Sequence, residues 1–426
     1  MPFENAARKL PPQSHERAAR KKEEEVIELS PEDLEEVVDE EAMELSPDEL
    51  IEVREPGELQ EPDVVEAFEV EGFKGLDVAV TLEAKNERKK NPENRNQDNI
   101  IADPETGLLG VLDGLGGETH GDLASKTAEE KMPGHFAETM KKLAKEDPSA
   151  IGDRLVEQQL AHLGITDIGL QTAARKQLTD MVENAMTKDP EMGRKALALI
   201  EAMKATSADV AETKGKTTAT VGFVHETPDG SRWAVVANIG DSGAFKRREN
   251  GEMVPLTKED SLYNAMVNSG AVTPEILDEM KYNPDKAVSV PVSLDQFKTL
   301  GGDEPTYKKL KGTMPISYKK MKAVMITALG QKNVEPSLAI RKLEPGDELV
   351  LATDGVIDKF ENQLSEETEL DELASALSMG TNMTDRLNAF RRISKERTTY
   401  KKDDDIAIVS ARVPKRAMKN QNKKAA

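Results

Sequence analysis

The sequence predicts an α+β fold in which an antiparallel β-sandwich lies in the middle and helices flank it, an α-β-β-α arrangement. Apolar segments of alternating polarity are joined by short turns, and strands connected in this way run antiparallel. The helical segments are collected in two blocks, whereas a parallel sheet requires regular alternation of strands and helices. A chain of 426 residues is long enough for one large domain with extensions.

The first strands and helices follow from local patterns. The segment LDVAVTLEA, from Leu76, alternates as a strand does, and NIIADPETGLLGVLDG contains two strands joined by a turn at residues 103–107. Residues 122–212 contain almost no strand pattern but several helical stretches, such as EMGRKALALIEAMKA. These stretches form the first block of helices.

Strands return in the second half of the chain. TTATVGFVHE and RWAVVANIGDSGAFKRR are expected strand segments, and a turn follows near Asn250-Gly251. Helices are expected from about Leu262, and a polar region follows them at about 283–320. DELVLATDG is a strand, further helices extend to about Lys395, and DDIAIVSARV is the last strand.

The N-terminal residues are expected to be an appendage. Residues 21–70 hold 21 acids and 3 bases, a local charge of −18, which leaves only −4 of the net −22 for the rest. Two related units, ELSPEDLEEV from Glu28 and ELSPDELIEV from Glu44, each place Ser-Pro where a helix begins. Helices this short are unstable alone, so the segment is either a largely disordered extension or a docking element that orders on a protein partner. The chain is thus expected to consist of an acidic extension, 1–62, a folded domain, 63–413, and a basic tail, 414–426.

The composition excludes several kinds of site and partner. The absence of cysteine rules out disulfides, thiolate metal sites and a phosphatase that works through cysteine, and with only five histidines a zinc site is not expected. No apolar run approaches the ~20 residues that span a bilayer, and the N-terminus lacks the apolar core of a signal peptide. We therefore expect a cytoplasmic protein without a membrane partner. The acidic segment would repel nucleic acid.

Five aspartates stand at the ends of predicted strands. Asp113 ends the strand in GLLGVLDG, and an Asp-Gly pair taken alone is typical of a tight turn. Asp98, Asp241, Asp354 and Asp404 occupy similar places, and each of them alone also has an ordinary role as a cap or a solvated strand end. Carboxylates at the ends of adjacent strands can converge on one edge, where they repel unless they are protonated or bridged by cations. Mg²⁺ and Mn²⁺ take oxygen ligands of this kind.

The chain resembles the metal-dependent protein phosphatases, the serine/threonine phosphatase 2C-like (PPM) family of bacterial type, from about Leu76 to Val413. The matching segments occur in the family's order and are NQDN at 96–99, GVLDGLGG at 110–117, VANIGDS at 236–242, PLTKEDS at 255–261, SLYNAMVNSGAVTPE at 261–275, VEPSL at 334–338, LEPGDELVLATDGVID at 343–358 and DDIAIV at 404–409. The family's fold, two packed antiparallel sheets flanked by helices, agrees with the layout predicted above.

The resemblance implies a site for two Mg²⁺ or Mn²⁺ ions. Asp113 would bridge the two ions, and Asp354 and Asp404 would complete the first. Asp98, directly or through water, and the main-chain carbonyl of Gly114 would hold the second. The glycine would let the backbone approach an ion closely.

The resemblance also implies a reaction. Asp241 matches an aspartate that binds a third, weaker metal in many bacterial relatives. A water that bridges two cations would lose a proton near neutral pH and attack phosphorus in line with a seryl or threonyl oxygen of a phosphoprotein. The metals would also offset the negative charge of the transition state.

Some positions depart from the family's pattern. Leu115 stands where many eukaryotic relatives have a proposed proton-donating histidine, so the general acid is unassigned, and His120 is expected to be a solvated loop residue. Glu93 stands where the family usually has a phosphate-binding arginine. Arg95 is the candidate substitute, with an ordinary exposed base as the alternative, and Gly243 replaces another common arginine.

Two functions therefore stay open. The intact set of acids favours an active protein phosphatase, and the displaced arginine favours a phosphatase-fold adaptor that binds phosphoproteins without turnover. In relatives, a flap beside the active site influences substrate choice. The polar region at 283–320 is longer than the family usually carries there, and we expect a surface subdomain or a mobile loop. The acidic extension either docks on a partner or inhibits the site by mimicking phosphate.

Overall fold

The computed structural model describes eleven stretches of the chain. They are residues 64–84, 96–115, 120–165, 168–268, 272–283, 285–292, 294, 304–357, 375, 382–389 and 404–415. All of them belong to the second of the two units into which the chain divides, Glu61–Ala426. The predicted extension at 1–62, most of the basic tail, and Arg95 lie outside the described residues.

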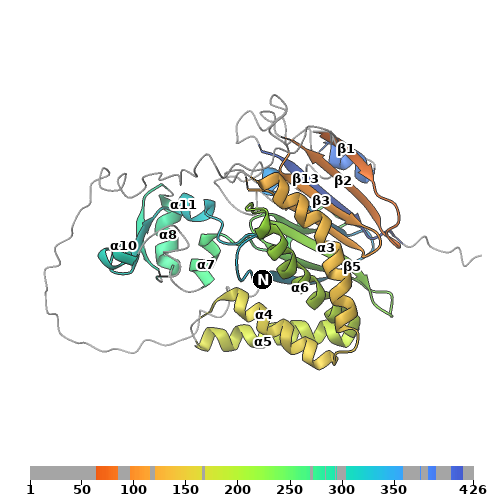
Figure 1. Ribbon diagram of the computed structural model, residues 1–426, viewed down its shortest axis with the longest axis horizontal. Helices are drawn as coiled ribbons and strands as arrows, with labels where there is room; N and C mark the ends of the chain where they lie inside the picture. Colours follow the sequence, from red (N-terminus) through yellow and green to blue (C-terminus); the bar gives the residue numbers. More distant parts are fainter. Residues whose placement is uncertain are drawn as a thin grey trace, which may run out of the picture. The chain divides into compact units, whose positions relative to one another are not determined.

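Two antiparallel sheets form the centre of this unit (Figure 1). The six-stranded sheet has the order β1-β2-β13-β12-β7-β8, and the five-stranded sheet has the order β11-β6-β5-β4-β3. Their bounds are β1 Val64–Glu69, β2 Asp77–Glu83, β3 Asp98–Asp103, β4 Leu108–Asp113, β5 Ala219–Glu226, β6 Arg232–Ile239, β7 Gly243–Arg247, β8 Met253–Pro255, β11 Ser337–Leu343, β12 Glu348–Ala352 and β13 Ile406–Arg412. The predicted antiparallel sandwich is confirmed.

The side chains of β4 show why the sheets form layers. Successive side chains of a strand point to opposite faces. Leu108 and Leu112 lie in the core under the helices, whereas Leu109 and Val111 lie in the core between the two sheets. Both faces of the strand are therefore apolar, and a layer must cover each of them.

The strand β12, in the six-stranded sheet, also has apolar side chains on both faces. Leu349 and Leu351 belong to the core between the sheets, and Val350 belongs to the core on the outer face. Met383 and Leu387 cover that outer face from a helical stretch at residues 383–389. With helices on both outer faces, the layers follow the predicted α-β-β-α order.

The first block of helices covers the five-stranded sheet. It consists of α3 Gly121–Leu143, α4 Pro148–Leu163, α5 Ile168–Lys188 and α6 Pro190–Glu212. Asp147 and Asp189 cap α4 and α6 by accepting hydrogen bonds from Ser149 N at 2.8 Å and Glu191 N at 3.0 Å, and prolines hold the first positions. Helices α3 and α6 pack against each other and against the sheet, and α4 and α5 lie side by side (Figure 1).

A module with its own core follows β8. It consists of α7 Leu262–Asn268, α8 Pro274–Tyr282, β9 Val288–Pro291, α10 Glu304–Lys309, β10 Thr313–Ile316 and α11 Tyr318–Ala323. Leu262, Met280, Val290 and Ile316 are among the buried residues of this core. In the described residues, the predicted polar region therefore contributes β9, α10 and β10 to the same core as the helices α7 and α8.

Several strands are not anticipated by the sequence patterns, β1 and β11 among them. β1 pairs with β2 through a register shift between Val65 and Phe68, and it lies at the sheet edge directly after the acidic segment. β11 pairs with β6 in regular register, although its sequence, SLAIRKL, carries two bases. No helix in the described part of the chain is long and apolar enough to cross a membrane.

Candidate functional site

The hairpin of β3 and β4 brings two of the predicted acids together. Asp98 begins β3, Asp113 ends β4, and the two are direct cross-strand partners in the register. Cβ atoms of such partners lie about 4.5–5.5 Å apart. The pairing continues one residue further, because Gly114 N donates to the Gln97 carbonyl at 3.0 Å. Two carboxylates therefore stand side by side at the open end of this hairpin.

The end of β12 brings two more acids together. Asp354 begins the short helix α12, Asp354–Ile357, directly after Thr353. A Cβ atom on Gly355 would lie 1.8 Å from the Asp405 carbonyl oxygen and 3.3 Å from Asp404 Cβ. Only glycine lets the first turn of α12 approach the start of β13 so closely. This approach brings the start of α12, where Asp354 stands, against Asp404 and Asp405.

Two hydrogen bonds join the two sheets at this edge. Thr353 Oγ1 donates to Asp98 Oδ2 at 2.8 Å, and Gln97 N donates to Asp405 Oδ2 at 3.0 Å. Thr353 and Asp405 are both buried. The sequence interpretation missed both residues. For Asp405 the available signal was the run of three aspartates at 403–405, from which the patterns alone do not select the buried member.

The electrostatics of Asp98 and Asp113 show that the predicted acids converge. Burial raises the pKa of Asp98, and the nearby charges of Asp405, Asp354 and Asp404 raise it further, while the hydrogen bond from Thr353 lowers it. Burial also raises the pKa of Asp113, as do Asp98, Asp354 and Asp241. We define these residues as the carboxylate cluster: Asp98, Asp113, Asp241, Asp354, Asp404 and Asp405.

The donor set of the cluster suits hard divalent cations. Among the described residues, no three His, Cys, Asp or Glu side chains are positioned to hold a metal ion together. Asp354 nevertheless lies close enough to Asp113 to raise its pKa, after the larger effects of burial and of the charge on Asp98. Mutually repelling buried carboxylates are stabilised either by a shared proton or by a cation. The oxygen-only chemistry of these side chains fits Mg²⁺ or Mn²⁺.

Gly114 has a packing reason to be glycine. A Cβ atom there would lie 2.1 Å from the carbonyl oxygen of Gly121 and 2.8 Å from that of Gln97. The start of α3 is therefore pressed against the end of β4. The glycine is needed for this contact, whatever its carbonyl binds.

The family-model comparison identifies the chain. The model for protein phosphatase 2C matches residues 88–390, which is more than half of the sequence. The chain belongs to the protein phosphatase 2C family. A comparison with curated protein sequences gave no significant match.

Solved structures of phosphatases are similar to this phosphatase 2C family member. The serine/threonine phosphatase PstP/Ppp of Mycobacterium tuberculosis is 19% identical, over 80% of this chain and 99% of that chain, with a TM-score of 0.43. The catalytic domain of PstP in complex with two manganese ions is 17% identical, over 80% and 99%, with a TM-score of 0.43. Stp1 of Staphylococcus aureus is 17% identical, over 82% and 100%, with a TM-score of 0.44.

The structure describes two positions that depart from the phosphatase 2C pattern, Gly243 and Leu115. A Cβ atom on Gly243 would lie 3.0 Å from Ile357 Cδ1 and 3.1 Å from the Phe245 ring, so a larger side chain there requires these two side chains to shift. Leu115 continues the backbone pairing, since its N–H donates to the Lys216 carbonyl at 3.0 Å. His120 directly precedes α3, and its carbonyl accepts from Ala124 N at 2.9 Å. Its expected role as a loop residue stays a prediction.

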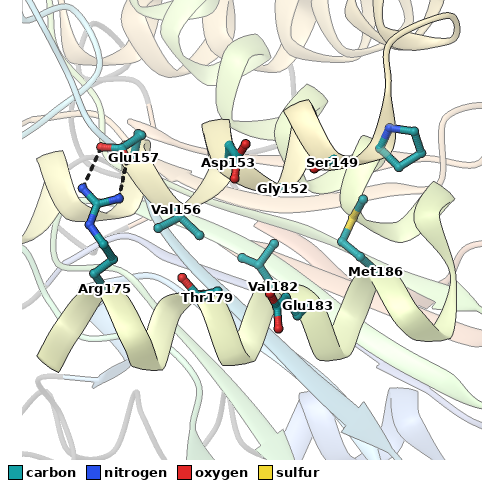
Figure 2. Close-up of a pocket in the computed structure, with 11 residues that line it drawn as sticks. Ser149, Gly152, Asp153, Val156, Glu157, Arg175, Thr179, Val182, Glu183 and Met186 are labelled. Atoms are coloured by element: carbon teal, nitrogen blue, oxygen red, sulfur yellow. Dashed lines mark hydrogen bonds and ion pairs between the residues drawn. The ribbon is translucent and has the colours of Figure 1, made fainter. Parts of the chain in front are cut away.

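A groove between α4 and α5 is separate from the carboxylate cluster (Figure 2). It has a volume of about 450 Å³, and none of its lining residues belongs to the cluster. Figure 2 shows Arg175 paired with Glu157 across it, at 2.5 Å and 3.2 Å. Both side chains are exposed, so the pair adds little stability.

Proposed function

We propose that this protein is a Mg²⁺- or Mn²⁺-dependent phosphatase that hydrolyses phosphoserine and phosphothreonine in proteins. The observation that carries the proposal is the convergence of six aspartates, from four separate parts of the chain, at one edge of the sandwich. Such a concentration of buried and half-buried negative charge is costly unless it binds cations or protons. Membership of the phosphatase 2C family supplies the reaction class.

The proposed ligands are those that the resemblance implies. Asp113 is the shared ligand, and Asp354 and Asp404 belong to the first ion. Asp98 and the carbonyl of Gly114 belong to the second ion. Asp241 belongs to a third, weaker ion.

The chain's own part is to hold these carboxylates in place. The bonds from Thr353 to Asp98 and from Gln97 to Asp405 fix the start of β3 against the ends of β12 and β13. Bound divalent cations would supply positive charge against a phosphate monoester and make water more acidic. The carboxylates must be deprotonated to bind a cation, and the raised pKa values of Asp98 and Asp113 mean that protons compete for the site.

The alternative is a phosphatase-fold adaptor that binds phosphoproteins without turnover. Glu93 supports it, because this residue stands at the family's phosphate-binding arginine position. Arg95 stays the proposed substitute for that arginine, and the group that protonates the leaving oxygen stays unassigned.

The test is hydrolysis of p-nitrophenyl phosphate and of a phosphothreonine peptide by the purified full-length protein. Mn²⁺ is the first ion to add. We expect Mn²⁺-dependent release of phosphate and a loss of about 100-fold or more in Asp113→Asn, because several kcal/mol of metal stabilisation convert to that factor. Asp77→Asn is the matched control, since Asp77 is exposed at the opposite end of β2 from the cluster.

Two results would overturn the proposal. One is wild-type protein that releases no phosphate with Mn²⁺ or Mg²⁺. The other is unchanged turnover in Asp113→Asn. Tight binding of the phosphopeptide without its hydrolysis would favour the adaptor.

A further inference from the structure

The module of α7 to α11 joins the sandwich through a neck of paired backbone. Ser261 and Met325 form an isolated antiparallel bridge. Leu262 N donates to the Val324 carbonyl at 2.8 Å, and Ile326 N donates to the Asp260 carbonyl at 2.9 Å. We define the neck as residues 260–262 and 324–327. The module has its own core, and the paired backbone of the neck connects it to the sandwich.

Asp260 is a buried carboxylate at the neck, with 6% of its surface exposed. Its Oδ2 accepts hydrogen bonds from Gly240 N at 3.1 Å and from Thr327 Oγ1 at 2.6 Å, and its own N–H donates to the Gly240 carbonyl at 2.8 Å. Backbone pairs already close the neck. The Asp260 carboxylate adds a second hydrogen bond to Gly240, beside the backbone one, and links it to Thr327.

Helix α4 meets the same carboxylate. His162 Nε2 lies 3.8 Å from Asp260 Oδ1, and His162 Nδ1 is hydrogen-bonded to the Glu335 carbonyl at 2.8 Å. A buried carboxylate is costly unless such partners surround it. Three separate elements therefore converge on Asp260: the neck, the turn after β6 and the end of α4.

Gly240 leads directly into the carboxylate cluster. Its φ of +100° is readily adopted only by glycine, and a Cβ atom there would lie 2.7 Å from Thr218 Cβ. Asp241 comes next, and then Ser242, whose hydroxyl shares a hydrogen bond of 2.8 Å with Thr218 Oγ1. Thr218 in turn holds the backbone of Asp113. Thr218 N donates to the Asp113 carbonyl at 2.8 Å, and Asp113 N donates to Thr218 Oγ1 at 3.2 Å. The turn 240–242 is thus fixed by Asp260 at one end and by Thr218 at the other.

We propose that Asp260 is a positioning residue for Asp241. It holds the turn 240–242 so that the Asp241 carboxylate stays beside Asp113, and it ties cation binding at Asp241 to the neck of the module. The part of this inference that concerns cations rests on the proposed function. The part that concerns the turn rests on the hydrogen bonds alone.

The experiment compares Mn²⁺ binding by calorimetry in full-length wild type, Asp260→Ala, Asp260→Asn and Asp347→Ala. Asp347 is the matched control. It is a buried carboxylate that accepts from Glu344 N at 2.8 Å and pairs with Lys246 at 2.7 Å, and it precedes β12 at the end opposite Asp354. Both alanine variants therefore lose a hydrogen-bonded buried carboxylate.

We expect Asp260→Ala to weaken the weakest Mn²⁺ site about tenfold, the scale at which supporting residues act on metal ligands. Asp347→Ala should lower stability and leave Mn²⁺ affinity unchanged. Asp260→Asn should restore affinity, since its amide oxygen can accept from Gly240 and Thr327 while its NH₂ faces His162. Wild-type affinity in Asp260→Ala, or an equal loss in Asp347→Ala, would overturn the inference.

A second variant and a second measurement keep the test decisive. If Asp260→Ala does not fold, Thr327→Val removes one of the two donors to Oδ2, and we expect a smaller loss in the same direction; unchanged affinity would count against the inference. If wild type binds no Mn²⁺, the proposed function fails. Amide hydrogen exchange at 240–242 then decides the positioning claim: exchange should be faster in Asp260→Ala, or in Thr327→Val, than in Asp347→Ala, and equal rates would overturn it.

Discussion

Replacing Thr353 by valine changes little in shape but removes two hydrogen bonds at the edge where the sheets meet. The Thr353 hydroxyl donates to Asp98 Oδ2 at 2.8 Å and accepts from Ala407 N at 3.0 Å, and the side chain is fully buried. The first bond is worth about 1–2 kcal/mol, and a buried N–H left without a partner costs about 1–3 kcal/mol. We therefore expect Thr353→Val to lower the free energy of unfolding by about 3 kcal/mol.

Urea unfolding of the metal-free protein measures this loss. With an m-value of about 3 kcal/mol/M, the midpoint should fall by roughly 1 M. Thr220→Val is the control, because Thr220 is equally buried but its hydroxyl makes one such bond, to Asn238 Oδ1 at 2.5 Å, so its loss should be smaller, about 1–2 kcal/mol. A Thr353→Val midpoint within about 0.2 M of wild type, or a larger loss in Thr220→Val, would refute the reasoning.

Three further predictions concern pH, packing and the extension. Burial and repulsion raise the folded-state pKa values of Asp98 and Asp113 above the ordinary range of an aspartate, so the folded apo protein binds more protons than the unfolded chain. Its stability should fall as the pH rises from about 4 through the raised values. Urea unfolding at several pH values measures this fall, and added Mn²⁺ should reverse it. A metal-free protein that becomes more stable as the pH rises through this range would contradict the prediction. Gly355→Ala should abolish Mn²⁺-dependent turnover and destabilise the fold, because its Cβ would lie 1.8 Å from the Asp405 carbonyl oxygen; wild-type turnover would show that α12 does not need this contact. Deletion of residues 1–62 should leave turnover of a small phosphate ester within about threefold, a barrier change of roughly 0.65 kcal/mol. A much larger rise, with salt activating the full-length protein, would indicate the inhibitory role instead.

Local patterns in the sequence determined most of the strands and helices. The turn at 103–107 and the alternation on both sides of it predict the β3–β4 hairpin, because turn chemistry and side-chain period act over a few residues. The final strand follows from DDIAIVSARV in the same way. Even the meeting of Asp98 and Asp113 is close to a local result, since the hairpin register alone pairs them. β1 was not predicted because the acidic segment next to it obscures its alternation. β11 was not predicted because its two bases weaken the apolar pattern.

Only the tertiary structure decided which residues support the carboxylates. Thr353 and Asp98 are 255 residues apart in the chain, and no local pattern encodes their hydrogen bond. The same holds for Asp405, which the triple aspartate did not distinguish, and for Asp260, which in the sequence is one acid among 80. The need for glycine at 355 is also visible only in the structure, where the Asp405 carbonyl leaves no room for a Cβ atom. Strand patterns and turn chemistry depend on residues that are neighbours in the sequence. The burial of a side chain and its hydrogen-bond partners depend instead on which distant segments the packed sheets bring together.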